Sequence, residues 1–180
     1  MIIYAETERL ILREILPTDI EGMFELDSNP EVHRYLGNNP VKDKNSIIDI
    51  IAFIRQQYQD FGIGRWAVVD KQTNDFIGWC GLKYIIDETN GHNHYYDLGY
   101  RLIQRYWGKG FATEAAQATL RYGFDKLELP VIYAIAACEN EGSNNVLKKI
   151  GFTYIEGFQD DQIACNWYQI NAMENLRCSS

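Results

Sequence analysis

The order of elements along the chain predicts an α/β fold in which helices pack against one mixed sheet. Three observations carry this prediction: short apolar runs bounded by turn residues, longer stretches with apolar positions at helical spacing, and a near-continuous apolar run at Val131–Cys138, which is typical of a buried strand. The 180 residues are 46% hydrophobic and 23% charged, which is ordinary for a globular protein. Because no Pro-, Gly- or Ser-rich linker interrupts them, we expect a single domain over residues 1–180.

The first third of the chain is expected to contain one strand and two helices. Leu10–Glu14 forms a short strand. Thr18 followed by Glu21 has the spacing of a capping box, so a helix is expected to start there and to end at Asn29–Pro30. A second helix starts near Ser46. Its apolar residues recur with the 3.6-residue period of a helix and are Ile47, Ile50, Ile51, Ile54 and Tyr58.

The rest of the chain alternates between strands and two further helices. The expected strands are Arg65–Asp70, Phe76–Tyr84, Tyr95–Ile103, Val131–Cys138, Phe152–Phe158 and Cys165–Ala172. One helix runs from Ala112 to about Lys126, and its small residues permit close packing on the sheet. The other runs from Ser143 to Ile150 and ends at Gly151.

The charge of the chain excludes some classes of function. Its 17 Lys and Arg against 25 Asp and Glu give a formal net charge of −8, which argues against nonspecific binding to nucleic acid or to an anionic membrane. We expect no signal peptide, membrane span or lipid anchor, and the cytoplasm as the location. The cysteines form no C-x-x-C pair and are expected to be reduced thiols: Cys80, Cys138, Cys165 and Cys178.

The most informative segment lies between a strand and the start of a helix, at Arg105–Ala112. Gly108 and Gly110 let the backbone adopt positive φ and approach a ligand closely. A helix N-terminus presents free N–H groups and the positive end of the helix dipole, so a pyrophosphate is the expected guest. The segment is neither a P-loop nor a Rossmann fingerprint. Two glycines in a turn are also compatible with a role in chain geometry alone.

Longer motifs favour the ligand interpretation. The pattern Arg105-x-x-Gly108-x-Gly110 resembles the acyl-CoA pyrophosphate loop of the GNAT N-acetyltransferases. Asn140–Phe152 resembles the N-x-x-S and V-L-x-K-x-G-F segment of that family, and Thr7–Arg13 resembles the opening of its RimJ/RimL-like branch. The resemblance spans nearly the whole chain. It implies a mostly antiparallel sheet with helices on both faces and two splayed parallel strands in the middle.

The resemblance also implies which residues bind acetyl-CoA. Main-chain N–H groups near Leu102 and Ile103 would hold the pantetheine and polarise the thioester carbonyl. N–H groups from Tyr106 to Phe111 would bind the pyrophosphate, and Asn140 would hydrogen-bond the pantetheine arm. The complete expected set is Leu102, Ile103, Arg105, Tyr106, Trp107, Gly108, Lys109, Gly110, Phe111, Ala112, Asn140 and Ser143.

The implied reaction is direct attack of an amine on the thioester. Many family members place a Tyr seven residues after the Asn, but Leu147 occupies that position here. Ser143 resembles the acid of the RimL-like branch and is also compatible with an N-cap for the following helix. Asp97 is a candidate base acting through water, or else a solvated charge at a strand edge. Cys138 as an acyl carrier is disfavoured against a small buried side chain.

More than one function is compatible with these motifs. If the protein is an enzyme, the acceptor is a protein N-terminal amine or else a small amine such as an antibiotic, a polyamine or an amino acid. A non-catalytic acyl-CoA-binding module and an unrelated α/β nucleotide-binding protein are two competing hypotheses. No metal is expected, because His92 and His94 lack a third ligand nearby. A homodimer is left open.

Overall fold

Eight strands form one sheet in the order β1-β2-β3-β4-β5-β6-β8-β7 in the computed structural model, which describes residues 1–172. All neighbours are antiparallel except β5 and β6, which are parallel. The strands are β1 (Ile3–Glu6), β2 (Leu10–Glu14), β3 (Arg65–Asp70), β4 (Phe76–Ile85), β5 (Tyr95–Leu102), β6 (Val131–Ala137), β7 (Thr153–Asp160) and β8 (Ile163–Asn171). The predicted mixed α/β fold is confirmed.

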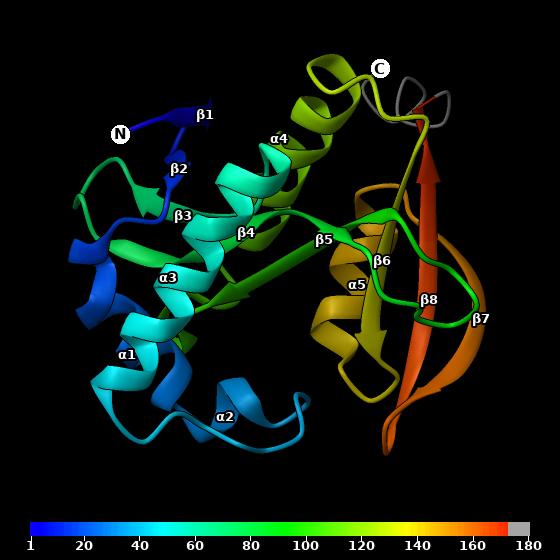
Figure 1. The fold of residues 1–180 in the computed structure, drawn as a ribbon, viewed down its shortest axis with the longest axis horizontal. Coiled ribbons are helices and arrows are strands. Elements are labelled where there is room, and N and C mark those ends of the chain that lie inside the picture. The colour runs from blue at the N-terminus through cyan, green and yellow to red at the C-terminus, as the bar shows by residue number, and fades with distance from the viewer. Residues whose placement is uncertain (173–180) are drawn as a thin grey trace.

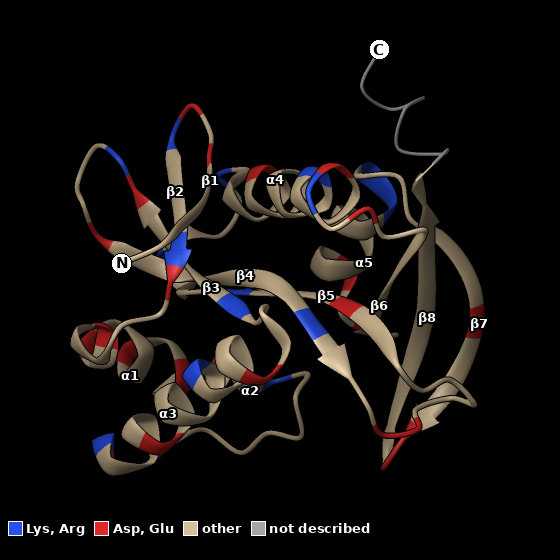
Figure 2. Cartoon of the chain, turned by 45° about the horizontal axis from the view of Figure 1, so that its top comes forward, with Lys and Arg blue, Asp and Glu red and all other residues tan. Residues whose placement is uncertain are grey.

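Five α-helices and two 3₁₀ turns cover the two faces of the sheet. They are η1 (Pro17–Asp19), α1 (Ile20–Ser28), α2 (Pro30–His33), α3 (Lys44–Phe61), η2 (Gln104–Tyr106), α4 (Phe111–Asp125) and α5 (Glu141–Lys149). Helices α4 and α5 lie on one face, and α1, α2 and α3 lie on the other (Figures 1 and 2). We call these the α4/α5 face and the α1–α3 face.

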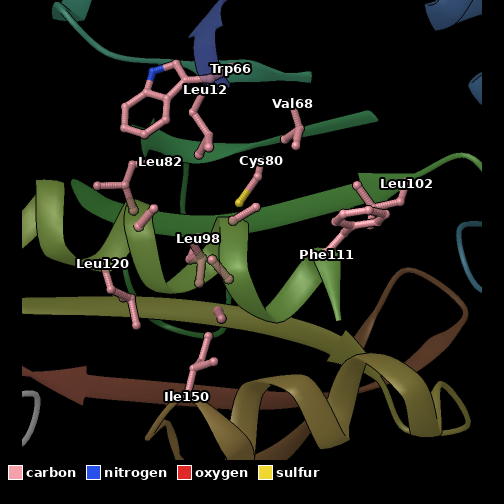
Figure 3. Packing of buried hydrophobic residues seen from close by; sticks show 14 of the residues in the cluster. Leu12, Trp66, Val68, Cys80, Leu82, Leu98, Leu102, Phe111, Leu120 and Ile150 are labelled. Carbon is pink, nitrogen blue, oxygen red and sulfur yellow. The ribbon is translucent and has the colours of Figure 1, made fainter. Parts of the chain in front are cut away.

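The α4/α5 face carries the larger core. Because side chains alternate along a strand, Leu12, Val68, Cys80 and Leu98 all point toward α4 (Figure 3). The small residues of α4 allow this close approach: a Cβ at Gly123 would lie 2.7 Å from Cδ1 of Ile132. The α1–α3 face has a smaller core of Ile15, Met23, Ile47, Ile51, Ile54 and Ala67.

The first helical segment differs from the prediction. Thr18 does not cap it: residues Pro17–Asp19 form a 3₁₀ turn, and α1 then starts at Ile20 without a side-chain cap. Asp19 is instead bound by Arg13, with two N–O distances of 2.7 Å. A second correction is that Pro30 begins the short helix α2 rather than only ending α1. The spacing of Thr18 and Glu21 was therefore a coincidence of sequence.

The helices and cysteines bear on whether the chain has a membrane span or disulfides. Within residues 1–172, no helix combines the length and the apolar character that crossing a bilayer requires. Cys80, Cys138 and Cys165 are free thiols. Cys178, with the C-terminal Ser179–Ser180, lies outside the described residues.

Candidate active site

The two parallel strands β5 and β6 separate after a single residue pair. Asp97 pairs with Tyr133, and beyond that pair β5 continues to Leu102 and β6 to Ala137 without further pairing. Figure 1 shows β5 running obliquely to β6. The splay that the resemblance implied is therefore present. It opens a gap between the part of β5 after Asp97 and the part of β6 after Tyr133, and it leaves main-chain groups on both sides of this gap without sheet partners.

The turn from β5 into α4 presents free main-chain N–H groups. Gly108 and Gly110 have φ angles of 72° and 80°, in the left-handed region that favours glycine. Within the described chain, no protein acceptor is bonded to the N–H groups of residues 108–113. These groups include those of the first turn of α4, which have no partner within the helix. With the helix dipole, they form a site suited to an anion.

Three other main-chain donors of the expected set are already in use. The N–H groups of Tyr106 and Trp107 close the turns of η2, with N–O distances of 2.9 and 3.0 Å. The N–H of Ile103 donates to the carbonyl of Ile77 at 3.0 Å. Because successive N–H groups of an antiparallel strand point to opposite edges, that of Leu102 faces away from β4, toward the gap. The N–H groups of Ile103, Tyr106 and Trp107 are thus not free for a ligand. The N–H of Leu102 points to the side of β5 where a ligand in the gap would lie.

The long side chains of the loop have partners within the protein. Arg105 forms an ion pair with Glu25 of α1, and its guanidinium lies 4.8 Å from the ring centroid of Tyr106. Lys109 Nζ lies 5.5 Å from the same ring centroid. The indole N–H of Trp107 donates to the carbonyl of Leu102 at 2.7 Å. The main chain, rather than these side chains, therefore offers the free donors of the loop.

Asn140, rather than Ser143, caps α5. The helix begins at Glu141, and Asn140 Oδ1 accepts a hydrogen bond from the N–H of Ser143 at 3.1 Å. The expectation that Ser143 caps this helix is wrong, because the helix begins two residues earlier than predicted. The Ser143 hydroxyl is consequently free of a capping role. Asn140 keeps its Nδ2 group for a ligand, because the cap uses only Oδ1.

A tyrosine that the sequence motifs did not single out contacts Ser143. The hydroxyl of Tyr100, on β5, lies 3.0 Å from Ser143 Oγ and donates to the Ser143 carbonyl at 3.1 Å. Burial raises the pKa of Tyr100 above its ordinary value, and the hydrogen bond to Ser143 opposes this shift. The phenol therefore stays protonated at neutral pH. Leu147 stands at the position where the resembled family often has a tyrosine. In this chain β5 instead places a different phenol, that of Tyr100, beside Ser143.

Asn144, the next residue of α5, connects this helix to the end of β6 and to β8. Its Nδ2 group donates to the carbonyls of Ala137 and Asn140 at 2.9 and 2.7 Å. Its Oδ1 accepts from Asn166 Nδ2 at 2.8 Å and from the Tyr168 hydroxyl at 2.6 Å, both on β8. One turn of α5 therefore contacts β5 through Ser143 and the end of β6 through Asn144.

Asp97 is a paired and largely buried carboxylate. Its side chain is 14% exposed and forms an ion pair with Arg65 Nη2, so the solvated strand-edge alternative is wrong. Arg65 Nη1 also donates to the carbonyls of Asp97 and Gly81, at 2.7 and 2.6 Å. A Cβ at Gly99 would lie 2.6 Å from Arg65 Nη2, so glycine there leaves room for the guanidinium. Burial raises the pKa of Asp97, and Arg65 acts against that rise.

Asp97 and Ser143 reach the gap from opposite faces of the sheet. Tyr100 points toward the α4/α5 face, where it meets Ser143. Asp97 is three residues before Tyr100 in the strand, so its side chain points to the α1–α3 face together with Arg101. The structure does not bring the two candidate catalytic residues into contact; it places them on opposite faces of the sheet.

Comparison with known proteins agrees with this geometry. The profile of the acetyltransferase (GNAT) domain matches residues 9–153, which include the strand, the loop and α5. The chain belongs to the GNAT acetyltransferases. As a GNAT N-acetyltransferase it is an enzyme that transfers an acetyl group to an amine.

Relatives of this GNAT enzyme cover most of its length. It is 36% identical over 146 residues to an uncharacterized N-acetyltransferase, p20, of Bacillus licheniformis, covering 81% of this chain and 80% of p20. It is 35% identical over 147 residues to the uncharacterized N-acetyltransferase YoaA of Bacillus subtilis, covering 82% and 81% of the two chains. A GNAT-family acetyltransferase structure from Bacillus anthracis superposes with a TM-score of 0.79 at 27% identity, covering 97% of this chain and 100% of that one.

Other candidate residues of the GNAT enzyme have ordinary structural surroundings. The His92 ring stacks on Trp167, with centroids 4.9 Å apart and planes 15° apart, and His94 Nδ1 lies 3.1 Å from the Tyr84 hydroxyl. Cys138 is exposed, so the expectation of a small buried side chain is wrong, and its Sγ donates to Asn166 Oδ1 at 3.2 Å. In the described part of the chain, no three His, Cys, Asp or Glu side chains form a group suited to a metal ion.

One surface pocket of the GNAT enzyme lies on the α1–α3 side of the molecule, and neither candidate catalytic residue lines it. It encloses about 560 Å³ and is lined by residues of α1, by Phe76 at the start of β4 and by Arg105. The chemistry is therefore assigned from the gap and the loop rather than from this pocket.

Proposed function

We propose that this enzyme acetylates the N-terminal amine of a protein, with acetyl-CoA as the donor. One observation carries the assignment of the donor: the parallel strands open immediately beside unbonded N–H groups of residues 108–113. Those groups suit the diphosphate of acetyl-CoA. The N–H of Leu102 and the Nδ2 group of Asn140 are assigned to the pantetheine and the thioester carbonyl.

The acceptor amine is assigned to the α1–α3 face, where Asp97 lies. A primary amine is mostly protonated at neutral pH and first loses a proton to solvent to become nucleophilic. The nitrogen then attacks the thioester carbon, a C–N bond forms, and Asp97 takes a second proton from nitrogen through a water molecule. Arg65 opposes the rise in the Asp97 pKa that burial causes and so favours the carboxylate form that a base requires.

The leaving thiolate is assigned to the α4/α5 face, at Ser143. As the C–S bond breaks, the Ser143 hydroxyl donates a hydrogen bond to the sulfur. The Tyr100 phenol has one proton, which it donates to the Ser143 carbonyl. When that proton turns to Ser143 Oγ, 3.0 Å away, it strengthens the donation of the Ser143 hydroxyl to the sulfur. The thiolate is stabilised by the hydrogen bond and takes its proton from solvent, so Tyr100 need not ionise.

Charge supports a protein N-terminus over a polyamine as the acceptor. The chain is 27% identical both to a putative ribosomal N-acetyltransferase, YdaF, of Bacillus subtilis and to spermidine N(1)-acetyltransferase of Escherichia coli. A polyamine carries further ammonium groups that require free carboxylates. The least exposed carboxylates near the gap on the α1–α3 face are each paired: Asp97 with Arg65, and Asp27 with Arg101 at 2.5 Å.

The test is release of free CoA from acetyl-CoA with a panel of acceptors. We expect peptides with free N-termini to release CoA faster than spermidine or small monoamines at equal concentration. Peptides with blocked N-termini control for lysine acetylation. Faster turnover of spermidine or another small amine would contradict the acceptor assignment. Acetyl-CoA binding without turnover of any acceptor would favour a non-catalytic module.

A further inference from the structure

The turn between β1 and β2 lies against the start of α4 through Arg9. Arg9 Nε donates to Glu114 Oε2 at 2.7 Å, and Arg9 Nη1 donates to the carbonyl of Lys109 at 3.0 Å. The Arg9 guanidinium also lies 4.4 Å from the ring centroid of Phe111. Three contacts from three residues of the loop and helix therefore fix this side chain, although it is 42% exposed.

The bond to Lys109 has a consequence for the neighbouring N–H group. The peptide between Lys109 and Gly110 is trans, so its carbonyl and its N–H point in opposite directions. Arg9 binds the carbonyl, and the N–H of Gly110 therefore points away from Arg9. This N–H belongs to the unbonded set at the start of α4. Without Arg9, no other described side chain donates to the Lys109 carbonyl to hold the peptide in this orientation.

Arg9 also compensates a negative charge at an anion site. Glu114 lies in the first turn of α4, where its carboxylate would repel a diphosphate. Burial raises the pKa of Glu114, but hydrogen bonds from Thr7 and Arg9 outweigh burial and leave that pKa below its ordinary value. Glu114 is therefore ionised, and its charge is balanced by the guanidinium 2.6 Å away.

We propose that Arg9 is a positioning residue for the diphosphate of acetyl-CoA, which orients the Gly110 N–H toward the anion and neutralises Glu114. This inference rests on the proposed binding of acetyl-CoA at the loop. It assigns a role in substrate binding to the Thr7–Arg9 segment, which contacts the loop from about 100 residues away in sequence. Arg9 does not touch the reacting atoms.

The experiment compares ligands with and without the diphosphate. We expect Arg9→Met to weaken binding of CoA by about tenfold or more, because a charge-assisted contact and the Gly110 orientation are both lost. Binding of pantetheine, which lacks the diphosphate, should not change. In kinetics, KM for acetyl-CoA should rise while kcat at saturation and kcat/KM for acetyl-pantetheine stay the same. Arg9→Lys keeps the charge and should restore part of the affinity.

Lys71→Met provides the matched control. Lys71 Nζ donates to the Thr7 carbonyl at 2.7 Å in the same turn but has no contact with the loop, so neither ligand should be affected. Equal losses of affinity for CoA and pantetheine in Arg9→Met would overturn the proposal and indicate a general structural role. Unchanged affinity for CoA would also overturn the proposal. Arg9→Lys supplies the same comparison if Arg9→Met does not fold. Failure of the wild-type enzyme to bind CoA would instead refute the proposed function.

Discussion

Replacing Ser143 by Ala removes one hydroxyl and leaves the fold around it intact. The cap of α5 is Asn140, whose Oδ1 still accepts the N–H of residue 143. The Tyr100 hydroxyl still has the main-chain carbonyl of residue 143 as an acceptor, at 3.1 Å. We therefore expect the free energy of unfolding to change by less than about 1 kcal/mol. For a chain of this size, that corresponds to a shift in Tm below about 4 °C.

Catalysis should respond much more strongly than stability. The Ser143 hydroxyl is assigned to donate to the leaving thiolate, and a hydrogen bond to a charged group is worth about 1.5–3 kcal/mol. Its loss lowers kcat by about 10- to 150-fold. KM for acetyl-CoA should change little, because the loop and Leu102 are untouched.

Steady-state release of CoA and thermal unfolding should be measured together on the same preparations. Asn145→Ala is the matched control, since Asn145 is an exposed residue of the same helix. It should leave both kcat and Tm nearly unchanged. A Ser143→Ala enzyme with wild-type kcat would refute the assignment of the hydroxyl. A large fall in Tm would show instead that the side chain is structural.

The polar contacts at the gap give three further predictions. Arg65→Met leaves the burial of Asp97 uncompensated, so the pKa of Asp97 rises and the acidic limb of the kcat/KM–pH profile moves to higher pH. Arg65→Lys should move this limb less, and a limb that does not move in Arg65→Met would exclude Asp97 as the base. Gly99→Ala displaces the Arg65 guanidinium and should lower the free energy of unfolding in denaturant by about 1–3 kcal/mol. It should also move the acidic limb of the pH profile to higher pH, and unaltered stability would contradict the close contact. Asn144→Ala removes four hydrogen bonds and leaves the Tyr168 hydroxyl without its acceptor, so the free energy of unfolding should fall by about 3–5 kcal/mol, or Tm by about 10 °C. A shift in Tm within experimental error would contradict this hydrogen-bond network.

Local patterns predicted most of the regular elements. Leu10–Glu14 and Arg65–Asp70 were placed at their observed bounds, because their apolar residues are buried on the sheet. The strand Ile3–Glu6 was not predicted, since it is a short edge strand and Ile3 is 45% exposed. The helix α2 has four residues, which is too short for a periodic pattern.

The side-chain pairs of the site could not be predicted from local patterns. Tyr100 and Ser143 are 43 residues apart in sequence, and Arg65 and Asp97 are 32 apart. Nothing in either neighbourhood indicates the partner, because the contacts depend on sheet register and on the position of α5. The start of α5 decided the role of Ser143, and a shift of two residues transferred the cap to Asn140.

The placement of Asp97 and Ser143 on opposite sides of the sheet has a kinetic consequence. On the proposed assignment, the amine reaches the thioester carbon from the α1–α3 face while acetyl-CoA is bound from the α4/α5 face, so neither substrate has to leave before the other arrives. Initial-rate plots for the two substrates should therefore intersect, as for a ternary complex. The same assignment gives the acetylated product and free CoA separate exits, and blocking one should leave dissociation of the other unimpeded.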